Sequence, residues 1–413
     1  MRIINSKIIL GGCNMPDLDL DLDSVDLDDV SLDDVDLSDF GEVNESVDYP
    51  HIKVGSKSLK EFLKVATKVC SSGGKDIISK AVCLVYDKEK EKVVCYATDF
   101  DVYVEVDLES LDMENILTEP VVIATSVLTK LCSAVPTNTL IYKKEDSFFI
   151  RLYGGDMEIE TNNIVVDKFK FSDSVEKVDS ISAEGLYSVI KDFGPVVSAA
   201  VNPIEKRIVV ESDGAFATYL FSVLRCKGIK GEYDIKSKDI EVLKILNVSK
   251  KDEELLVNKT VEGTAVKRVQ IVGSNYKYTF LVSEAQVSDT LKSNMETVLG
   301  DSGVYIDYVQ IAKMCDLACT LPFALGKVGM KYSESGISLD VKTKKGTSNL
   351  FDIPGSIEGK VDTNGKELVV QAKLLMIVLK SFAGKASIRL SLAEEGIGIK
   401  ADDYEAVIYN EAV

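Results

Sequence analysis

The chain has no tryptophan and only one histidine, His51, among its 413 residues. A histidine-based metal site, or a nucleophile activated by histidine, would therefore have to use His51, which lies beside a strongly acidic segment. The eight cysteines are scattered and form no CxxC pair. Cys315 and Cys319 are one helical turn apart, which is more typical of two small core residues than of metal ligands. We therefore expect no metal and no cofactor.

Long apolar runs are also missing. No stretch approaches the ~20 consecutive apolar residues that a membrane-spanning helix requires. Scattered, unpaired cysteines are typical of proteins in a reducing compartment. The sequence therefore predicts an intracellular, cytoplasmic protein.

A phosphate-binding loop is absent as well. The only related stretch, Gly73-Gly74-Lys75, lacks the leading glycine spacing and the following Ser or Thr of that motif. Carboxylates are abundant near the N-terminus, but an acidic run without a fold cannot hold catalytic geometry. We therefore expect that the protein is not an enzyme.

Acidic residues are concentrated in residues 1–50. This segment has two basic residues against fourteen acidic ones, eleven of them Asp between positions 17 and 39, and carries −12 of the net charge of −19. Such dense like charge predicts a disordered extension, although its regular Leu and Val also suit a segment that docks on a partner. A solvated leader and loose binding of divalent cations are alternatives. The rest of the chain is only mildly acidic, so it could bind nucleic acid through a gathered set of lysines.

Residues 57–100 contain the pattern that organises the remaining chain. Apolar residues recur with helical spacing from Leu59 to Cys70, whereas Lys60, Lys64 and Lys68 fall on the opposite face. Two predicted strands follow at 82–86 and 92–97. A lysine stripe on one helix is usually a solvated surface, so its significance depends on whether it recurs.

The pattern recurs twice. Predicted first helices begin near residues 58, 182 and 306 and second helices near 125, 237 and 371, a period of about 124 residues. We predict an α+β protein of three tandem domains, each with two helices packed on antiparallel sheets. The expected boundaries are 51–172, 173–288 and 289–413, and the stretches 167–179 and 284–303 are interpreted as connectors. All six helices carry lysine outside the apolar face.

Three such units resemble the bacterial-type sliding clamp, the β processivity factor of replicative DNA polymerases. The first helix, with Ser58 followed by alternating Leu and Lys, is similar to the family's first helix. Ala97-Thr98-Asp99 and Glu211-Ser212-Asp213-Gly214 resemble a Thr-Asp turn that the family carries in its first two domains. A last strand at 406–409 also ends close to the C-terminus, as it does in the family.

Two segments depart from the family pattern. Ala215-Phe216-Ala217 replaces a basic pair followed by Leu, and Tyr409-Asn410-Glu411-Ala412-Val413 replaces a Met-Pro-rich end. Because both segments border the family's partner-peptide cleft, partner specificity is in doubt. The divergence and the acidic extension would suit a virus-encoded clamp, which would act in an infected host cell.

The resemblance implies a homodimeric ring that slides on duplex DNA without reading sequence. It also implies a polymerase and a clamp loader as partners, in the cytoplasm or nucleoid. The alternative is a non-enzymatic scaffold built of repeated α+β units. The implied DNA contacts are Lys60, Lys64, Lys68, Lys75, Lys130, Lys191, Lys238, Lys244, Lys313, Lys373 and Lys380. The implied cleft residues are Ser212, Asp213, Gly214, Ala215, Phe216, Ala217, Tyr409, Asn410, Glu411, Ala412 and Val413.

The N-terminal extension suggests regulation. Residues 36–40 (DLSDF) are similar to the short partner peptides of the family, with Asp39 in place of one apolar anchor. As a tethered ligand, this segment could occupy even a weak site in the cleft. Alternatively, the Asp run mimics the charge of DNA and lies against the lysines.

Overall fold

The computed structural model describes residues 47–410, except for 71–75, 136, 154, 248–252, 262–263, 265, 284, 321–323, 344–347 and 364. Residues 45–413 form one compact unit, as judged by which residues contact one another. The acidic residues 1–46, the cleft residues 411–413 and Lys75 therefore lie outside the described residues.

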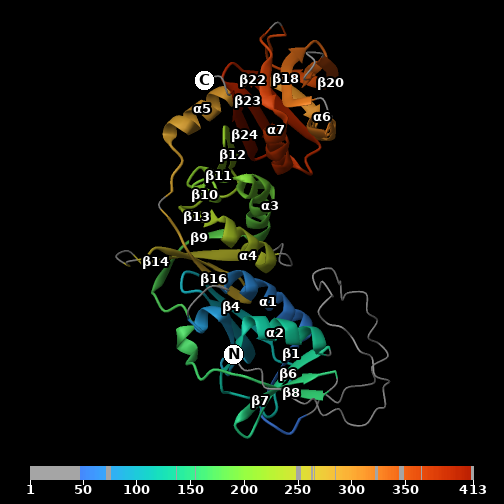
Figure 1. Ribbon diagram of the computed structural model, residues 1–413. Coiled ribbons are helices and arrows are strands. Elements are labelled where there is room, and N and C mark those ends of the chain that lie inside the picture. The colour runs from blue at the N-terminus through green and yellow to red at the C-terminus, as the bar shows by residue number, and fades with distance from the viewer. Residues whose placement is uncertain are drawn as a thin grey trace, which may run out of the picture. The chain divides into compact units, whose positions relative to one another are not determined.

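One order of elements is repeated three times along the chain (Figure 1). The first unit comprises β1 (His51–Gly55), α1 (Ser56–Val69), β2 (Ala81–Asp87), β3 (Lys92–Thr98), β4 (Tyr103–Glu109), β5 (Val121–Ala124), α2 (Thr125–Leu131), β6 (Asn138–Lys144), β7 (Ser147–Leu152) and β8 (Gly155–Ile159). The second comprises β9 (Val175–Ser182), α3 (Ala183–Ala199), β10 (Arg207–Glu211), β11 (Gly214–Tyr219), β12 (Ser222–Cys226), β13 (Tyr233–Lys236), α4 (Ser237–Asn247), β14 (Glu254–Thr260), β15 (Arg268–Val272) and β16 (Tyr276–Leu281).

The third unit follows an additional helix, α5 (Asp289–Leu299). It comprises β17 (Gly303–Asp307), α6 (Tyr308–Thr320), β18 (Ala324–Ser333), β19 (Gly336–Thr343), β20 (Ser348–Glu358), β21 (Leu368–Gln371), α7 (Ala372–Leu379) with the short turn η5 (Lys380–Phe382), β22 (Ser387–Ala393), β23 (Gly396–Ala401) and β24 (Tyr404–Tyr409). The α+β class and the six predicted helices are confirmed, whereas the three exact domain boundaries stay a prediction.

Two stretches interpreted as connectors contain regular structure. The strand β9 overlaps the connector at 167–179, and α5 lies within the one at 284–303. Only Ile181 of β9 is buried, so the strand lacks a clear alternation of apolar and polar residues. The helix α5 buries Met295, Val298 and Leu299, all near its C-terminal end. Neither element therefore has enough buried apolar positions to produce a strong periodic signal.

Antiparallel sheets continue across both joints between units. In an eight-stranded sheet, β4 of the first unit pairs with β16 of the second, with Tyr276 opposite Val106. In a twelve-stranded sheet, β12 of the second unit pairs with β24 of the third, with Ser222 opposite Ile408. Each joint thus pairs the fourth strand of one unit with the eighth strand of the next.

The main hydrophobic core lies between the sheets and the six helices of the repeats. The face of α1 predicted to be apolar, from Leu59 to Val69, is buried there. Strand residues alternate between the two faces of a sheet, so Ala215 and Ala217 belong to this core whereas Phe216 points to the other face. On that other face α5 covers Phe216 through Met295 and Val298.

The joint between the second and third units contains a buried charged group. Glu405 of β24 is 2% exposed and accepts hydrogen bonds from Arg225 Nε of β12 and from Lys227 Nζ, each at 2.8 Å. Arg225 also pairs with Glu296 of α5. Burial alone would raise the pKa of Glu405, but the hydrogen bonds and charges of Lys227 and Arg225 outweigh it and hold the pKa below its usual range. Arg225 therefore joins the second unit, the connecting helix and the third unit.

Replacing Glu405 by Ala is expected to lower the free energy of unfolding by about 3–5 kcal/mol, because it leaves the buried Arg225 without its main partner. Urea unfolding at neutral pH measures the loss. Glu395→Ala, at an exposed position in the neighbouring β23 hairpin turn, should stay within about 0.5 kcal/mol of the wild type. Equal stability of the two variants would contradict a structural role for Glu405.

Candidate nucleic-acid and partner surfaces

The six helices of the repeats form one continuous row. The order of neighbours is α2, α1, α4, α3, α7 and α6, because α1 contacts both α2 and α4, and α3 contacts both α4 and α7. Each helix buries its apolar side in the common core, so its remaining side faces away from the sheets. Figure 1 shows these helices following one another through the three units.

The outward side of this helix row is basic. Its helices and η5 carry eleven exposed or half-buried lysines against four exposed carboxylates, whereas the whole chain has 48 basic and 67 acidic residues. We call these lysines the lysine row: Lys57, Lys60, Lys64, Lys68, Lys130, Lys191, Lys238, Lys244, Lys313, Lys373 and Lys380. An acidic protein thus has a basic surface along its helices, which suits a polyanion.

Two of the predicted DNA contacts are held in ion pairs across the first joint. Lys68 of α1 lies 2.6 Å from Glu241 of α4, and Lys238 of α4 pairs with Asp99 in the β3–β4 turn. Lys244 is half-buried, with its Nζ beside Gly194 of α3. The other seven predicted lysines that the structure describes are exposed and form no ion pair with another described residue.

The predicted match between two Thr-Asp turns is wrong. Thr98 and Asp99 lie between the third and fourth strands of the first unit, but Ser212 and Asp213 lie between the second and third strands of their unit. The equivalent turn of the second unit follows Tyr219 and contains Leu220 and Phe221. The two motifs are similar in sequence, but they occupy different turns of the repeated unit.

The predicted cleft residues that the structure describes do not lie together at one exposed site. Ser212 and Asp213 are exposed, but Gly214 through Ala217 are buried. Tyr409 and Asn410 lie near the opposite end of the strands, roughly 17 Å away for five strand residues. The helix α5 contacts both ends. Its Lys292 pairs with Asp213 at 3.2 Å, and Tyr409 Oη donates a hydrogen bond to Leu291 O at 3.4 Å.

Phe216 belongs to the core rather than to a binding surface. Its side chain is 1% exposed, and Lys292 Nζ lies 5.2 Å from the centre of its ring. The same lysine pairs with Glu211, which also accepts a hydrogen bond from Val287 N at 2.6 Å. The start of α5 is therefore fixed over Phe216 by both charge and packing.

An exposed apolar surface missed by the sequence reasoning lies close to the second joint. It consists of Val201, Ile204, Leu220 and Phe221, which are 86%, 69%, 56% and 49% exposed. Leu220 N donates a hydrogen bond to Glu205 Oε1 at 3.2 Å, which holds the turn against the loop of Ile204. Tyr409 N donates to Phe221 O at 2.8 Å. We call these four residues the apolar patch.

One sequence signal could have located the patch. Leu220 and Phe221 occupy a tight hairpin turn, where Gly, Asn or Asp is usual, and Leu220 has a left-handed φ of 50°. A large apolar side chain at such a position is strained and exposed, so packing gives no reason for it.

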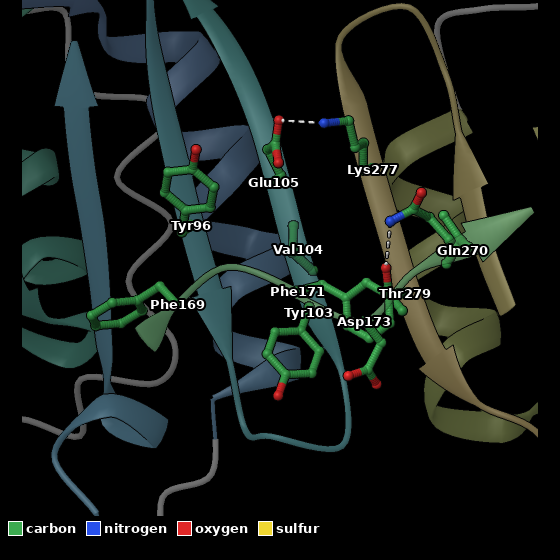
Figure 2. Close-up of a pocket in the computed structure, with 11 residues that line it drawn as sticks. Tyr96, Tyr103, Val104, Glu105, Phe169, Phe171, Asp173, Gln270, Lys277 and Thr279 are labelled. Atoms are coloured by element: carbon green, nitrogen blue, oxygen red, sulfur yellow. Dashed lines mark hydrogen bonds and ion pairs between the residues drawn. The ribbon is translucent and has the colours of Figure 1, made fainter. Parts of the chain in front are cut away.

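The first joint has a small pocket on the sheet face opposite the helices. Its volume is about 160 Å³, and aromatic rings from Tyr96, Tyr103 and Phe171 border it. Figure 2 shows Glu105 of β4 and Lys277 of β16 facing each other across the joint, with their charged atoms 3.0 Å apart. Gln270 Nε2 also donates a hydrogen bond to Thr279 Oγ1 at 3.1 Å beside the pocket. Because the Glu105–Lys277 pair joins two units, we assign the pocket a structural role in the joint.

The described residues contain no group of three or more His, Cys, Asp or Glu side chains arranged to hold a metal ion. Within the same part of the chain, no helix combines the length and apolarity needed to cross a bilayer.

Solved structures match this arrangement of strands and helices. A putative DNA polymerase III β subunit from Eubacterium rectale covers 88% of this chain and 100% of its own, with a TM-score of 0.69 and 13% identity. The chain has the fold of a bacterial sliding clamp. A DnaN sliding clamp from Pseudomonas aeruginosa bound to griselimycin has a TM-score of 0.70 at 14% identity, with 88% and 100% coverage. A Helicobacter pylori β clamp bound to a DNA ligase peptide has a TM-score of 0.68, with the same identity and coverage.

No family model matches the sequence, and no curated protein matches it either. The fold therefore confirms the resemblance that was inferred from the repeat. The amino-acid sequences have diverged too far for sequence comparison alone to find the match.

One buried acid within the helix row gives stability a pH dependence. Asp239 in the first turn of α4 is 3% exposed and accepts a hydrogen bond from Tyr278 Oη at 2.6 Å. Burial raises its pKa from 3.8 to about 6, although Tyr278 and nearby lysines oppose the shift. The folded state binds this proton more tightly than the unfolded state. The resulting stability is therefore present below pH 3.8 and is lost as the pH rises to about 6.

Asp239→Asn should therefore be more stable than the wild type at pH 7.5, by about 1–3 kcal/mol. The difference should disappear near pH 4, where Asp239 is protonated in the wild type. Urea unfolding between pH 4 and pH 7.5 measures it, with Asp316→Asn on the exposed side of α6 as the control. A gain of the same size at every pH would show that charge burial is not its cause.

Proposed function

We propose that the protein is a DNA sliding clamp that encircles duplex DNA and tethers a polymerase for processive synthesis. The observation that carries the proposal is the lysine row on a protein of net charge −19 with a sliding-clamp fold. Lysine is a flexible point charge that neutralises phosphate without reading base edges. A continuous row of such charges suits movement along the duplex, and the acidic remainder of the protein disfavours binding elsewhere. This role requires no catalytic chemistry.

Replacing Lys64, Lys191, Lys313 and Lys380 by Gln tests the DNA surface. Each lost phosphate contact should lower the slope of log affinity against log salt by about 0.9, and affinity at low salt should fall at least tenfold. Fluorescence anisotropy with a labelled duplex at several salt concentrations measures both quantities. The matched control replaces four exposed lysines outside the row: Lys88, Lys206, Lys331 and Lys366. Equal losses in the two variants would contradict the assignment of DNA to the helix row.

We further propose that two copies close a ring head to tail through the remaining joint strands. Inside the chain, the fourth strand of one unit pairs with the eighth strand of the next, at β4–β16 and at β12–β24. The corresponding strands that are not used in these two joints are the fourth strand of the third unit, β20, and the eighth strand of the first unit, β8. The described residues of β8 pair only with β7, and the first half of β20 pairs only with β19. Each edge exposes an apolar residue, Met157 in β8 and Leu350 in β20.

Leu350→Asp should weaken this dimer at least tenfold, because a charge would replace an apolar contact at the new strand pair. Light scattering across a concentration series measures the association, and negative-stain images report the ring. Leu111→Asp is the control, since Leu111 is similarly exposed but lies outside both edges. A dimer unaffected by Leu350→Asp would place the interface elsewhere.

The apolar patch is the surface that we propose for partner peptides. Its four apolar side chains are exposed, its turn at Phe221 is hydrogen-bonded to Tyr409 at the second joint, and a related fold is known with a DNA ligase peptide bound. An apolar anchor in a partner segment would remove Leu220 and Phe221 from water, which accounts for their position in a turn.

Phe221→Ala should weaken a peptide ending in Leu-Phe by roughly 1–3 kcal/mol, because a buried aromatic contact is lost. Titration calorimetry measures the affinity. The control Leu111→Ala removes an exposed apolar side chain of similar accessibility outside the patch. Unchanged affinity in Phe221→Ala, with binding intact, would place the peptide elsewhere.

A further inference from the structure

The first strand of each unit, β1, β9 or β17, differs in what covers its second edge. On one side, each pairs with the sixth strand of its own unit. On the other side of β1, His51 N donates a hydrogen bond to Asn115 O, and Leu117 N donates to His51 O, both at 2.9 Å. On the other side of β17, the second half of the fourth strand β20 forms an antiparallel ladder. The chain therefore covers this edge itself in the first and third units.

The corresponding edge of β9 has no partner strand in the described part of the chain. β9 is the last strand of the eight-stranded sheet and pairs only with β14. The segment in the equivalent position, 227–232, has six residues between β12 and β13, whereas eleven residues separate β4 from β5. Lys227 N at its start donates to Asp403 O, and Gly231 N near its end donates to Glu211 O. This connection is therefore short and hydrogen-bonded elsewhere, which leaves the edge of β9 open.

A groove of about 930 Å³ lies beside the open edge. Glu176 and Val178 of β9 line it, together with the ends of β10 and β13 and the described residues between 282 and 289. The latter segment is anchored to β13, because Ser283 Oγ donates a hydrogen bond to the buried Asp234 Oδ2 at 2.8 Å. Binding pockets for small ligands have volumes of roughly 300–1,000 Å³, so the groove is large enough for several side chains. We call it the β9 groove.

The wall of the β9 groove contains a buried polar group without a partner. Tyr233 of β13 lines the groove and is 4% exposed, yet its Oη has no hydrogen-bond partner among the described residues. Burial raises the pKa of Tyr233, and the charge of Asp179 in β9 adds to the rise, so the phenol lies close to β9. A buried hydroxyl without a partner is unfavourable, and a ligand that hydrogen-bonds to it would remove that cost.

The remaining side chains of the β9 groove indicate the chemistry of an occupant. Val178 is 45% exposed and offers an apolar contact beside the open strand edge. Lys259 and Lys292 already form ion pairs with nearby carboxylates. The exposed carboxylates of Glu176 and Asp289, in contrast, form no ion pair with another described residue. These groups favour a segment that combines an apolar side chain with a basic one.

We propose that an extended segment of a partner protein adds to the edge of β9 and fills the β9 groove. An apolar side chain of this segment covers Val178, and a basic one pairs with Glu176 or Asp289. The added strand completes the second unit as β20 completes the third. Backbone hydrogen bonds supply affinity in such strand addition, and the groove supplies specificity. The site lies at the end of β10 opposite to the apolar patch, and its occupation does not require that the protein binds DNA.

Hydrogen–deuterium exchange of the full-length protein alone tests whether the edge is open. About half of the amides of β9 should exchange at least tenfold faster than those of β17, because β17 is paired on both sides. Equal protection of the two strands would overturn the proposal. Protection of β9 that grows with protein concentration would also overturn it, since a second copy would then cover the edge.

A displayed library of random eight-residue peptides probes the β9 groove with the full-length protein as target. Selection should enrich peptides that combine an apolar residue with Lys or Arg. Val178→Lys should weaken a synthetic copy at least tenfold, because lysine blocks a strand edge and repels the basic residue. The control Val165→Lys, at a 65% exposed position outside the groove, should change affinity less than twofold. Failure to find any peptide that is sensitive to Val178→Lys alone would overturn the proposal.

Tyr233→Phe separates binding from folding. Because the Oη has no partner in the described part of the chain, this variant should keep the urea midpoint of the wild type and yet bind the selected peptide at least threefold more weakly. A lowered midpoint with unchanged peptide affinity would show that the phenol is structural and would overturn its place in the site.

The variant Phe221→Ala separates the β9 groove from the apolar patch. It should leave the affinity of the selected peptide within twofold of the wild type, and a larger loss would place the peptide on the apolar patch instead. Binding in the β9 groove by a protein without measurable affinity for duplex DNA would support this inference and reject the clamp function. Strong DNA binding without any peptide in the groove would do the reverse.

Discussion

Edge-strand pairing is the constraint on which the architecture depends. Every sheet of a repeat would expose unpaired backbone N–H and C=O groups at its edges if it stood alone, and such edges associate with whatever strand is near. In this chain, β4 and β12 satisfy one edge with β16 and β24 of the next unit. Pairing at a joint also fixes how the helices of neighbouring units meet. The contacts of α1 with α4 and of α3 with α7 follow from the strand ladders behind them.

Charged groups reinforce each joint in a different way. At the first joint, Glu105 is shared by Lys90 and Lys277 at the edge of a partly exposed pocket. At the second joint, Glu405 is almost fully buried against Arg225. A partly exposed ion pair contributes little free energy, whereas a buried one is costly to break from one side. The second joint, which α5 also crosses, is therefore the one whose charges are critical for the stability of the chain.

The arrangement of the helices allows an acidic protein to have a basic surface. A helix that buries one side leaves its other side free of packing constraints, so lysines can gather there without affecting the core. The ion pairs of Lys68 and Lys238 lie at the first joint, where two units must be held together. Lysines farther from that joint, such as Lys64, Lys191 and Lys313, have no such partner among the described residues and stay available to a polyanion.

The sequence predicted the features that depend on repeated burial. The six helices, most strands and the outward lysines of α1 were found because their apolar positions recur with a fixed period over many residues. The strand β9 and the helix α5 were missed because each is mostly exposed and provides few apolar positions. Long-range pairing, such as β12 with β24, has no local signature, so the joints could be located only in the structure.

The motif match that proved wrong compared only a few letters in a turn. The position of a turn in the fold depends on how many strands of the unit precede it. A short motif can therefore match at a hairpin that is not the equivalent one. Ser212 and Asp213 follow the second strand of their unit, whereas Leu220 and Phe221 follow the third, as Thr98 and Asp99 do in the first unit. At the equivalent turn, the chain has two exposed apolar residues in place of small polar ones. Such a strained and exposed position has no explanation in the packing of the described residues, and it therefore supports the proposal that the apolar patch binds a partner.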